Sequence, residues 1–246
     1  MKIGVTERGD PSIDFSWVEK MNEVDGAILI TKNLTGKLME EAMPFLDKLI
    51  FHVSCTGYGG TDIEPNIPSK FEQLLQAVKL RNLGVKNDRI VIRVDPIIPT
   101  VEGLSKATGV IMNAYRSGFR RFRISVLDCY PHVRERFRDM GMELPYGEGK
   151  FTASDEMFKN VDSVVRQLKK IYPDICIESC AEGKLSETEN IGCVSEKDLK
   201  LLGLGIAKVD EAGYQRKGCL CCSVKTELLS NKKQCPYKCL YCYWKT

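Results

Sequence analysis

Ile90-Val-Ile-Arg93-Val-Asp95-Pro96 is the stretch from which the fold can be deduced. Its β-branched residues would lie on both faces of an extended run, and the run ends in polar residues and a proline. Strands that are apolar on both faces are typical of parallel sheets covered by helices. Five further runs have the same character and complete a set of six expected strands: Lys2–Thr6, Ala27–Thr31, Leu49–Cys55, Phe122–Leu127 and Ile175–Cys180.

Segments with a helical period of apolar residues separate these runs. The expected helices cover Phe15–Asn22, Lys37–Leu46, Ser69–Leu83, Glu102–Ser117, Pro131–Met140, Ser154–Ile171 and Ser195–Leu202. Three of them begin at serines placed as N-caps, and the clearest is Ser69, which precedes Glu72 at capping-box spacing. Alternating strands and helices indicate repeated strand–helix units around a parallel sheet.

The predicted fold is therefore α/β, a TIM-barrel-like parallel barrel or partial barrel. At 246 residues the chain is long enough for one such barrel or for two small domains. A seventh or eighth strand is expected within residues 205–229. We expect residues 1–204 to form the barrel-like domain and residues 205–246 to form a cysteine-rich metal-cluster segment packed on its mouth.

The composition is that of an ordinary globular chain, with 43% hydrophobic and 28% charged residues. The net charge of +3 is too small to require nucleic acid or a membrane as partner. Arginines do gather in one part of the sequence, which we attribute mainly to solvated helix faces, with a phosphate-binding patch as the alternative. These residues are Arg116, Arg120, Arg121, Arg123, Arg134, Arg136 and Arg138.

Eleven cysteines are the unusual feature of the composition. The first residues, Met1 to Arg8, lack the apolar core of a signal peptide, and no later run approaches the length of a membrane span. We therefore expect a cytoplasmic protein with reduced thiols and no membrane partner. In such a protein, metal ligation or catalysis is favoured over a disulfide framework.

Polar residues follow every expected strand, at the end where a parallel barrel collects its functional groups. Arg93 and Asp95 alternate with Val94, so their side chains are expected to point into the same space, as part of a site or as a structural ion pair. We take Arg93, Asp95 and Glu182 as candidate catalytic residues. The candidate cofactor contacts at the same end of the barrel are Thr6, Arg8, Asp10, Lys32 and Tyr58.

The C-terminal stretch Cys235-Pro-Tyr-Lys-Cys239-Leu-Tyr-Cys242-Tyr-Trp244 carries three thiols on one short loop. A cubane iron–sulfur cluster usually takes four thiolates, so a loop that supplies three leaves one iron without a protein ligand. Half of a zinc site is the alternative, because Cys-x3-Cys and Cys-x2-Cys pairs also suit tetrahedral zinc. Cys235, Cys239 and Cys242 are therefore candidate metal ligands, with a [4Fe-4S] cluster favoured.

Four further thiols form a second candidate group: Cys180, Cys193, Cys219 and Cys221. Four thiolates close a coordination shell around structural zinc or around a second [4Fe-4S] cluster. Ligand softness suits both, and the cluster is weakly preferred because Cys-x-Cys is less common in zinc knuckles than Cys-x2-Cys. Cys222, adjacent to this group, has no assigned role.

Other chemically capable residues are interpreted as structural. Cys55, Cys129 and Cys176 are expected to be small buried residues, with Cys55 the most plausible exception because it ends a strand. His52 lies inside a strand and is expected to be a core residue with its polar atoms satisfied. The sequence has only two histidines, so it gives little support to a hydrolytic triad or a histidine-rich metal site.

Taken together, these stretches resemble a bacterial family of domains of unknown function whose C-terminal cysteines are similar to those of radical S-adenosylmethionine enzymes. The resemblance extends over nearly the whole chain and rests on Thr31-Lys-Asn33, Thr56-Gly-Tyr-Gly59, Ile63-Glu-Pro-Asn66, Arg93-Val-Asp95-Pro96, Ser179-Cys-Ala-Glu182, Gln215-Arg216, Cys219-Leu-Cys221 and Cys235 to Tyr243. Two places depart from the family pattern. Thr6-Glu-Arg-Gly-Asp10 replaces a Ser-Arg-Arg-Thr-Asp-like opening, and Pro236-Tyr237 replaces a Pro-His pair.

The resemblance implies a radical S-adenosylmethionine enzyme. In that superfamily the open iron of a [4Fe-4S] cluster is chelated by S-adenosylmethionine, which is then cleaved to a 5′-deoxyadenosyl radical, and an electron donor such as flavodoxin or ferredoxin is the implied partner. A triplet near the C-terminus further implies a circularly permuted barrel, in which Lys2–Thr6 follows the cluster loop in space. Thr6, Glu7 and Arg8 would then lie where such enzymes bind the methionine amino group.

The Cys-Pro-x-x-Cys-x-Tyr-Cys-Tyr form of the triplet also resembles the spore photoproduct lyase group of DNA repair enzymes. Nucleic acid or a nucleotide is therefore the favoured substrate class. A different function remains open: a non-catalytic zinc or iron–sulfur module that binds nucleic acid through its arginine-rich stretch. This alternative predicts that the affinity for DNA or RNA falls steeply as the salt concentration rises. A third is an electron-transfer protein, which would require fully ligated irons.

Overall fold

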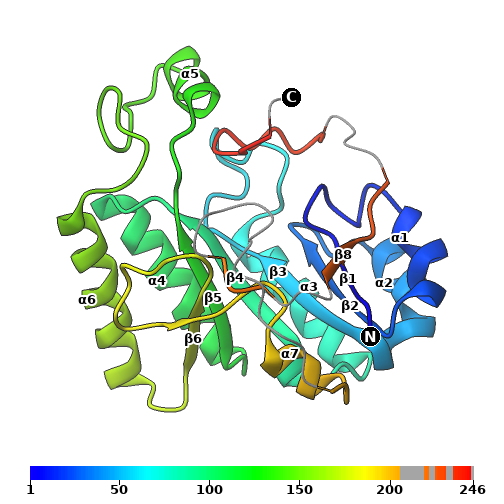
Figure 1. Cartoon of the computed structure of the whole chain (residues 1–246). Coiled ribbons are helices and arrows are strands. Elements are labelled where there is room, and N and C mark those ends of the chain that lie inside the picture. Colours follow the sequence, from blue (N-terminus) through cyan, green and yellow to red (C-terminus); the bar gives the residue numbers. More distant parts are fainter. Residues whose placement is uncertain (206–218, 222–224, 231–234, 245–246) are drawn as a thin grey trace.

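In the computed structural model, which describes residues 1–205, 219–221, 225–230 and 235–244, the chain forms one sheet of eight parallel strands (Figure 1). The strand order in the sheet is β7-β6-β5-β4-β3-β2-β1-β8. The strands are β1 Ile3–Val5, β2 Gly26–Thr31, β3 Leu49–Ser54, β4 Ile90–Ile97, β5 Arg121–Val126, β6 Cys176–Ser179, β7 Glu189–Asn190 and β8 Lys225–Glu227. All six expected strands are confirmed, and β8 lies within the range 205–229 where a further strand was expected.

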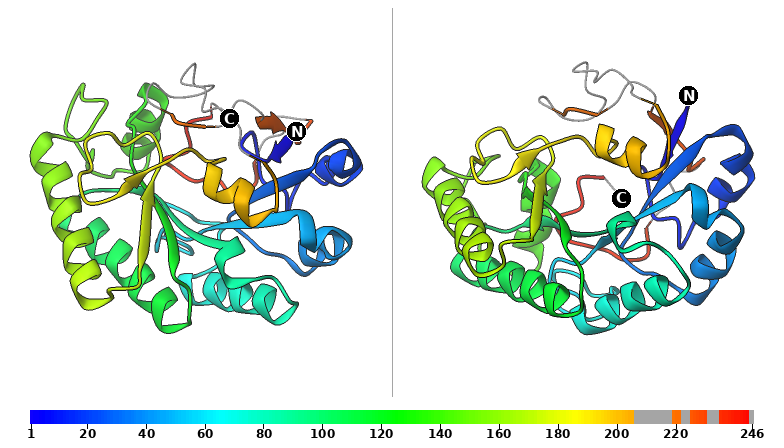
Figure 2. Two further views of the ribbon diagram at one scale, coloured as in Figure 1. Left: turned by 60° about the horizontal axis from the view of Figure 1, so that its bottom comes forward. Right: turned by 90° about the horizontal axis from the view of Figure 1, so that it is seen from below.

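Seven α-helices connect or follow the described strands, each close to its expected range. They are α1 Ser16–Glu19, α2 Gly36–Ala42, α3 Lys70–Asn82, α4 Val101–Arg116, α5 Pro131–Asp139, α6 Asp155–Ile171 and α7 Glu196–Leu201, and 3-10 turns cover Lys20–Glu23, Met43–Lys48 and Asn87–Arg89. The capping boxes at Ser69 and Ser195 are both present. Figure 2 shows α2, α3, α4 and α6 against the outer face of the curved sheet.

The sheet curves toward a barrel but has two edges, β7 and β8. Among the described residues no ladder pairs these two strands, so closure of the expected barrel is not confirmed. β8, which comes from the expected cysteine-rich segment, joins the same sheet by parallel pairing with β1, with Ile3 opposite Lys225. No helix among the described residues has the length and apolar character needed to cross a membrane.

Alternate side chains of each strand point to the inside of the curve, because a strand repeats every two residues. The first inward positions are apolar, and Ile3, Val5, Ile28, Ile50 and Val91 form one cluster with Val194, which precedes α7, and Leu199 of α7. Two residues beyond Val91 the inward position is Arg93, which pairs in register with Arg123 on β5, and Arg123 in turn lies opposite Glu178 on β6. The interior therefore changes from apolar to charged along the strands.

Helix α4 provides a sensitive test of the packing around the sheet. A β-carbon at Gly103 would lie 1.9 Å from the carbonyl oxygen of Ile98 and 2.9 Å from the Tyr58 hydroxyl, whereas one at Gly109 would meet nothing closer than the Lys70 Nζ at 3.5 Å. We expect Gly103→Ala to lower the free energy of unfolding by about 2 kcal/mol or more through overpacking. Gly109→Ala should raise it by about 0.5–1 kcal/mol through helix propensity. Urea unfolding of both variants would check this, and equal effects would contradict the packing described.

Candidate metal centres at the barrel mouth

The C-terminal loop, residues 235–244, lies across the carboxyl ends of the strands (Figure 1, red). Three hydrogen bonds fix it to the loops that follow β1 and β3. Leu240 N donates to the Ile63 carbonyl at 3.0 Å, Asn66 Nδ2 donates to the Pro236 carbonyl at 2.7 Å, and the Tyr237 and Ser12 hydroxyls lie 2.7 Å apart. The three cysteines of the loop are thereby held at the carboxyl ends of the strands.

Helix α5 holds the same loop from the other side. The guanidinium of Arg136 donates to the carbonyls of Cys242 at 2.6 Å and Trp244 at 2.7 Å. Hydrogen bonds from a charged donor contribute more than neutral ones because the charge strengthens the attraction to the carbonyl dipole. Arg136 therefore stabilises the end of the loop that carries Cys242.

We expect Arg136→Ala to speed amide hydrogen exchange of Leu240 and Cys242 at least about tenfold. A hydrogen bond from a charged donor contributes about 1.5–3 kcal/mol, and about 1.4 kcal/mol is a factor of ten. Arg138→Ala is the matched control, because Arg138 lies on the same helix but pairs with Glu148 on the surface. Equal exchange rates in the two variants would show that Arg136 does not hold the loop.

The environment of the three thiols differs from one to the next. Cys239 is buried, whereas Cys235 and Cys242 are half-buried. Burial raises the pKa of Cys239 to about 12, although the Lys32 ammonium acts to lower it. Burial raises the pKa of Cys235, and the charges of Asp10 and Cys242 act in the same direction.

Beside Cys239 lies a compact group made of Lys32, Glu64 and Tyr241. Lys32 Nζ is 2.9 Å from Glu64 Oε1 and 2.5 Å from the Tyr241 hydroxyl, which also donates to Glu64. Burial lowers the pKa of Lys32, but the charges of Glu64 and Cys239 outweigh it and raise that pKa, so the amine stays protonated. Among the predicted cofactor contacts, Lys32 is therefore the one whose charge acts directly on Cys239. Glu64 and Tyr241 were not chosen as site residues, although both lie in stretches that carry the family resemblance.

Arg93 and Asp95, both on β4, form an ion pair. Burial would raise the pKa of Asp95, but Arg93 and the Ser125 hydroxyl hold it down at about 2, so this carboxylate is ionised at neutral pH. The Arg93 guanidinium also lies 3.4 Å from His52 Nδ1. Burial and the neighbouring arginines lower the pKa of His52 well below its ordinary value, so the ring is neutral. Its Nε2 has no hydrogen-bond partner among the described residues, so the expectation of a fully satisfied core histidine is wrong.

The other predicted site residues make their hydrogen bonds and ring contacts outside the triplet, although Asp10 lies near enough for its charge to raise the pKa of Cys235. The Thr6 hydroxyl accepts from Ile30 N at 2.8 Å. Asp10 accepts from the backbone of Ser12 and Lys32, and Glu182 accepts from Val126 N at 2.9 Å. The ring of Tyr58 packs beneath the Lys106 ammonium of α4, and Arg8 is exposed. Some polar residues at strand ends thus lie beside the triplet, whereas others form hydrogen bonds that stabilise the surrounding loops.

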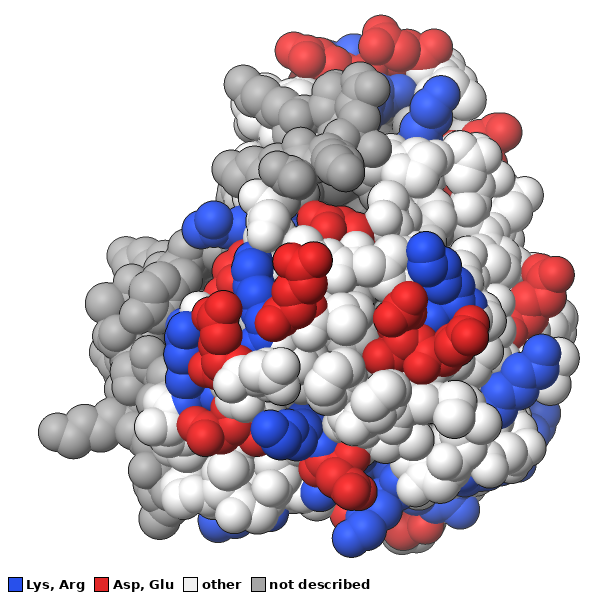
Figure 3. All heavy atoms as spheres, turned by 90° about the vertical axis from the view of Figure 1, so that its right-hand side faces the viewer, with Lys and Arg blue, Asp and Glu red and all other residues white. Residues whose placement is uncertain are grey.

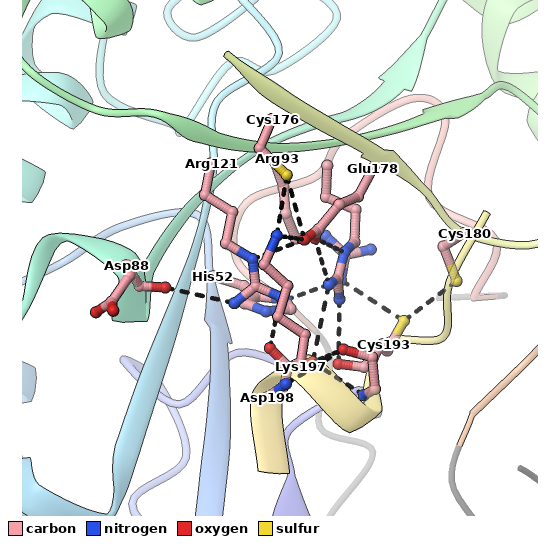
Figure 4. A network of polar contacts seen from close by, with 12 residues as sticks. His52, Asp88, Arg93, Arg121, Cys176, Glu178, Cys180, Cys193, Lys197 and Asp198 are labelled. Carbon is pink, nitrogen blue, oxygen red and sulfur yellow. Dashed lines mark hydrogen bonds and ion pairs between the residues drawn. The ribbon is translucent and has the colours of Figure 1, made fainter. Parts of the chain in front are cut away.

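The second cysteine group does assemble in space. Cys180 Sγ and Cys193 Sγ lie 3.4 Å apart, and Cys219 Sγ and Cys221 Sγ lie 3.0 Å apart (Figure 4 labels the first pair). Cys193 N also donates to Cys221 Sγ at 3.3 Å, which joins the two pairs. Among the remaining cysteines, Cys55 and Cys129 are buried in the main apolar core, Cys176 lies beside Lys197, and Cys222 falls outside the described residues.

A network of buried ions fills the interior next to this group (Figure 4). Glu178 accepts from Arg121 at 2.8 Å and from Arg123 at 2.6 Å, and Arg121 also donates to Asp198 of α7 at 2.7 Å. Lys197 approaches Glu178 to 3.0 Å. None of these residues was predicted as part of a site, although the alternation of Arg121 and Arg123 with Phe122 gave the same signal as Arg93 and Asp95.

The interpretation as solvated helix faces is wrong for Arg121 and Arg123, which are buried in β5, whereas Arg116 and Arg138 are exposed on α4 and α5. Arg120 pairs with Asp174, and Arg136 holds the C-terminal loop. On the face that carries α1 and α2, basic and acidic side chains are interspersed (Figure 3).

No curated protein matches this chain. Among solved structures it is similar to type I 3-dehydroquinate dehydratase from Clostridium difficile, solved with covalently modified comenic acid, at 15% identity and a TM-score of 0.33. The likeness covers 82% of this chain and 90% of that chain and is too weak to carry an argument about function. A family model described as a domain of unknown function, DUF1848, matches residues 12–244, which include both cysteine groups. The chain therefore belongs to the DUF1848 family.

Proposed function

We propose that the chain is a radical S-adenosylmethionine enzyme in which Cys235, Cys239 and Cys242 hold a [4Fe-4S] cluster. The observation that carries the proposal is the position of three thiols on one anchored loop across the carboxyl ends of a parallel α/β sheet (Figure 1). Thiolates are the ligands that iron–sulfur clusters require. A cluster held in this way supplies the reductive cleavage of S-adenosylmethionine.

The strand order supports the permuted form of such a barrel. β8, which precedes the triplet in the chain, pairs with β1 in parallel. The triplet loop therefore follows one strand, β8, whose neighbour in the sheet is β1, which is the arrangement expected for a permuted barrel. The loop also contacts the segment after β1 directly, because the Tyr243 hydroxyl donates to the Glu7 carbonyl at 3.0 Å.

The groups beside Cys239 suit the methionine part of S-adenosylmethionine. That part carries an ammonium and a carboxylate, which require an acceptor and a cation in the protein. Glu64 and Lys32 supply both in one buried place. We therefore assign recognition of the methionine moiety to these two residues, in place of the contacts with Thr6 and Arg8 that the resemblance implied.

The charged interior below the mouth suits a polar substrate. Arg93 and Asp95 are ionised and lie on the strand beside β3, at the same end of the barrel as Lys32, and the charge of Asp95 acts on Lys32. They are the candidates for substrate contact. The arginines that favoured nucleic acid are engaged in ion pairs and loop contacts, so a nucleotide or nucleic-acid substrate is supported by motif resemblance alone. Flavodoxin or ferredoxin is the proposed source of the electron.

The test is made on protein purified without exposure to air. We expect iron and sulfide in equal amounts and an electron paramagnetic resonance spectrum of the reduced protein that shifts when S-adenosylmethionine is added. We also expect 5′-deoxyadenosine to form under reducing conditions. A protein that contains zinc as its only metal, or a reduced cluster whose spectrum ignores S-adenosylmethionine, would refute the proposal.

A further inference from the structure

We propose that Cys180, Cys193, Cys219 and Cys221 bind one zinc ion, and that this ion joins the two edges of the open barrel. Sequence alone favoured a second iron–sulfur cluster at these cysteines, and the geometry points away from it. The inference does not depend on the radical chemistry proposed for the other cysteine group. It rests on sulfur distances, on the place of the four cysteines in the sheet, and on the groups around the sulfurs.

Two of the sulfur–sulfur distances are short enough for thiols that share one ion. With Zn–S bonds of about 2.3 Å, the sulfurs of a tetrahedral site lie about 3.8 Å apart. The separations are 3.4 Å for Cys180 and Cys193 and 3.0 Å for Cys219 and Cys221. The Cys193 and Cys221 sulfurs lie within 4.8 Å of each other and of a Glu7 carboxylate oxygen. In a cubane each thiolate binds a different iron at its own corner, so its four thiolates lie farther apart than those that share one ion.

The four cysteines lie on both sides of the gap between β7 and β8. Cys180 follows β6 directly, and Cys193 lies three residues beyond the end of β7. Cys219 and Cys221 precede β8, which is the opposite edge of the sheet. An ion bound to all four would connect the β6–β7 edge to the β8 edge at a place where no described ladder connects them.

The backbone at this place is shaped for close approach. A β-carbon at Gly192 would lie 2.4 Å from the Leu220 carbonyl oxygen and 2.5 Å from the backbone of Cys221. The segment that carries Cys193 can therefore reach the segment that carries Cys221 only because residue 192 has no side chain. This contact brings thiols from the two edges together without a hydrogen-bonded ladder.

Hydrogen-bond donors lie around the sulfurs, as expected for cysteines that are present as thiolates. Cys193 N donates to Cys221 Sγ at 3.3 Å, and Lys225 Nζ lies 3.7 Å from the same sulfur. The Arg93 guanidinium lies 3.8 Å from Cys193 Sγ. Four thiolates around one divalent ion carry excess negative charge, and hydrogen-bond donors of this kind stabilise metal ligands and fix their orientation.

The ion would also position the proposed catalytic loop. Lys225 is the first residue of β8, and β8 pairs with β1 a few residues before the chain reaches Cys235. Fixing the start of β8 at the seam therefore limits where the triplet loop can lie. We infer that loss of zinc would loosen residues 235–244 as well as the seam itself.

The experiment uses the full chain with Cys235, Cys239 and Cys242 all changed to alanine, so that the C-terminal triplet cannot contribute metal. We expect about one zinc per chain, no sulfide, and a zinc X-ray absorption spectrum that reports four sulfurs at about 2.3 Å. Iron with sulfide in this variant would overturn the inference in favour of a cluster. Absence of any metal, with the four thiols free or oxidised to disulfides, would overturn it as well.

A second pair of variants tests whether these cysteines are the ligands of the zinc ion. In the otherwise unchanged chain, Cys219→Ser combined with Cys221→Ser should lose the zinc, whereas Cys176→Ser should keep it, because Cys176 lies on the same strand as Glu178 but outside the group. The zinc-free double variant should exchange the amides of residues 235–244 faster than the control. Zinc retained at full stoichiometry in the double variant would overturn the assignment. If the double variant does not fold, the absorption spectrum of the triple variant still decides between zinc and a cluster.

Discussion

Replacing Cys239 by alanine is expected to lower reductive cleavage of S-adenosylmethionine at least about 100-fold. Loss of a residue that only supports a metal ligand commonly costs about 10–100-fold, and Cys239 is itself a proposed ligand. It is also the most deeply buried thiol of the triplet and the one next to Lys32. The measurement is 5′-deoxyadenosine formed by anaerobically reconstituted protein, together with iron and sulfide per chain.

Cys176→Ser is the control for this variant. Cys176 is partly buried like Cys242, but it contacts Lys197 at the far side of the ionic network, so its replacement should leave cleavage unchanged. Zinc content should also stay constant in both variants, because the second cysteine group is untouched. A Cys239→Ala protein that still cleaves S-adenosylmethionine at the wild-type rate would exclude the triplet as the catalytic centre.

The strands of this fold could be predicted because six of them combine β-branched composition with burial on both faces. The seventh, Glu189–Asn190, could not, since it has two polar residues and carries no hydrophobic signal. Its place at the sheet edge depends on pairing with Glu178 and Ser179 of β6, a tertiary contact that leaves no local trace in the sequence.

The candidate site was only partly predictable, because a polar residue at a strand end can point toward the mouth or toward a loop backbone. Lys32 and Asp10 both follow strands, yet the Lys32 amine reaches Glu64 whereas the Asp10 carboxylate accepts backbone N–H groups. The choice depends on loop geometry. Glu64 was missed for a different reason, since it lies within the long loop between β3 and α3 and not at a strand end.

The buried arginines were misread because their partners are remote in sequence. Arg121 is 57 residues from Glu178 and 77 from Asp198, so the charges that neutralise it are not visible near β5. At the second cysteine group, the identity of the ligands could not show from sequence which metal they bind. Thiolate softness suits zinc and iron alike, and only the distances between sulfurs distinguish one ion from a cluster.

Glu178→Gln is expected to lower the free energy of unfolding at pH 7 by about 3–5 kcal/mol. Removing one partner from a buried ion pair leaves charge that neither water nor another ion compensates. Glu178 is fully buried and contacts Arg121, Arg123 and Lys197, so the variant would leave three cations with Asp198 as their only anionic partner among the described contacts of this network. Urea unfolding of the variant and the wild type measures the difference.

The surface pair of Arg120 and Asp174 provides the matched control. Arg120 lies next to Arg121 in the chain and Asp174 lies near the start of β6, but both side chains are largely exposed, at 39% and 59%. Water solvates both charges when the pair is broken, so Asp174→Asn should leave stability almost unchanged. If the two substitutions lowered the free energy of unfolding equally, the buried ion pairs would contribute no more to stability than an exposed pair.

The effect of Glu178→Gln should also depend on pH in a defined direction. Burial would raise the pKa of Glu178, but Arg123 and Arg121 outweigh it and lower the pKa from the ordinary 4.5 to about 2. A carboxyl whose pKa is lower in the folded state contributes its full stability above pH 4.5 and loses it as the pH falls to about 2, which here amounts to about 3 kcal/mol. The stability difference between wild type and Glu178→Gln should therefore be constant from pH 7 to about pH 5 and shrink below that. A difference that stays constant down to about pH 3 would contradict this account. It would show that the charge of the Glu178 carboxylate does not stabilise the interior and that the amide destabilises it for a steric reason.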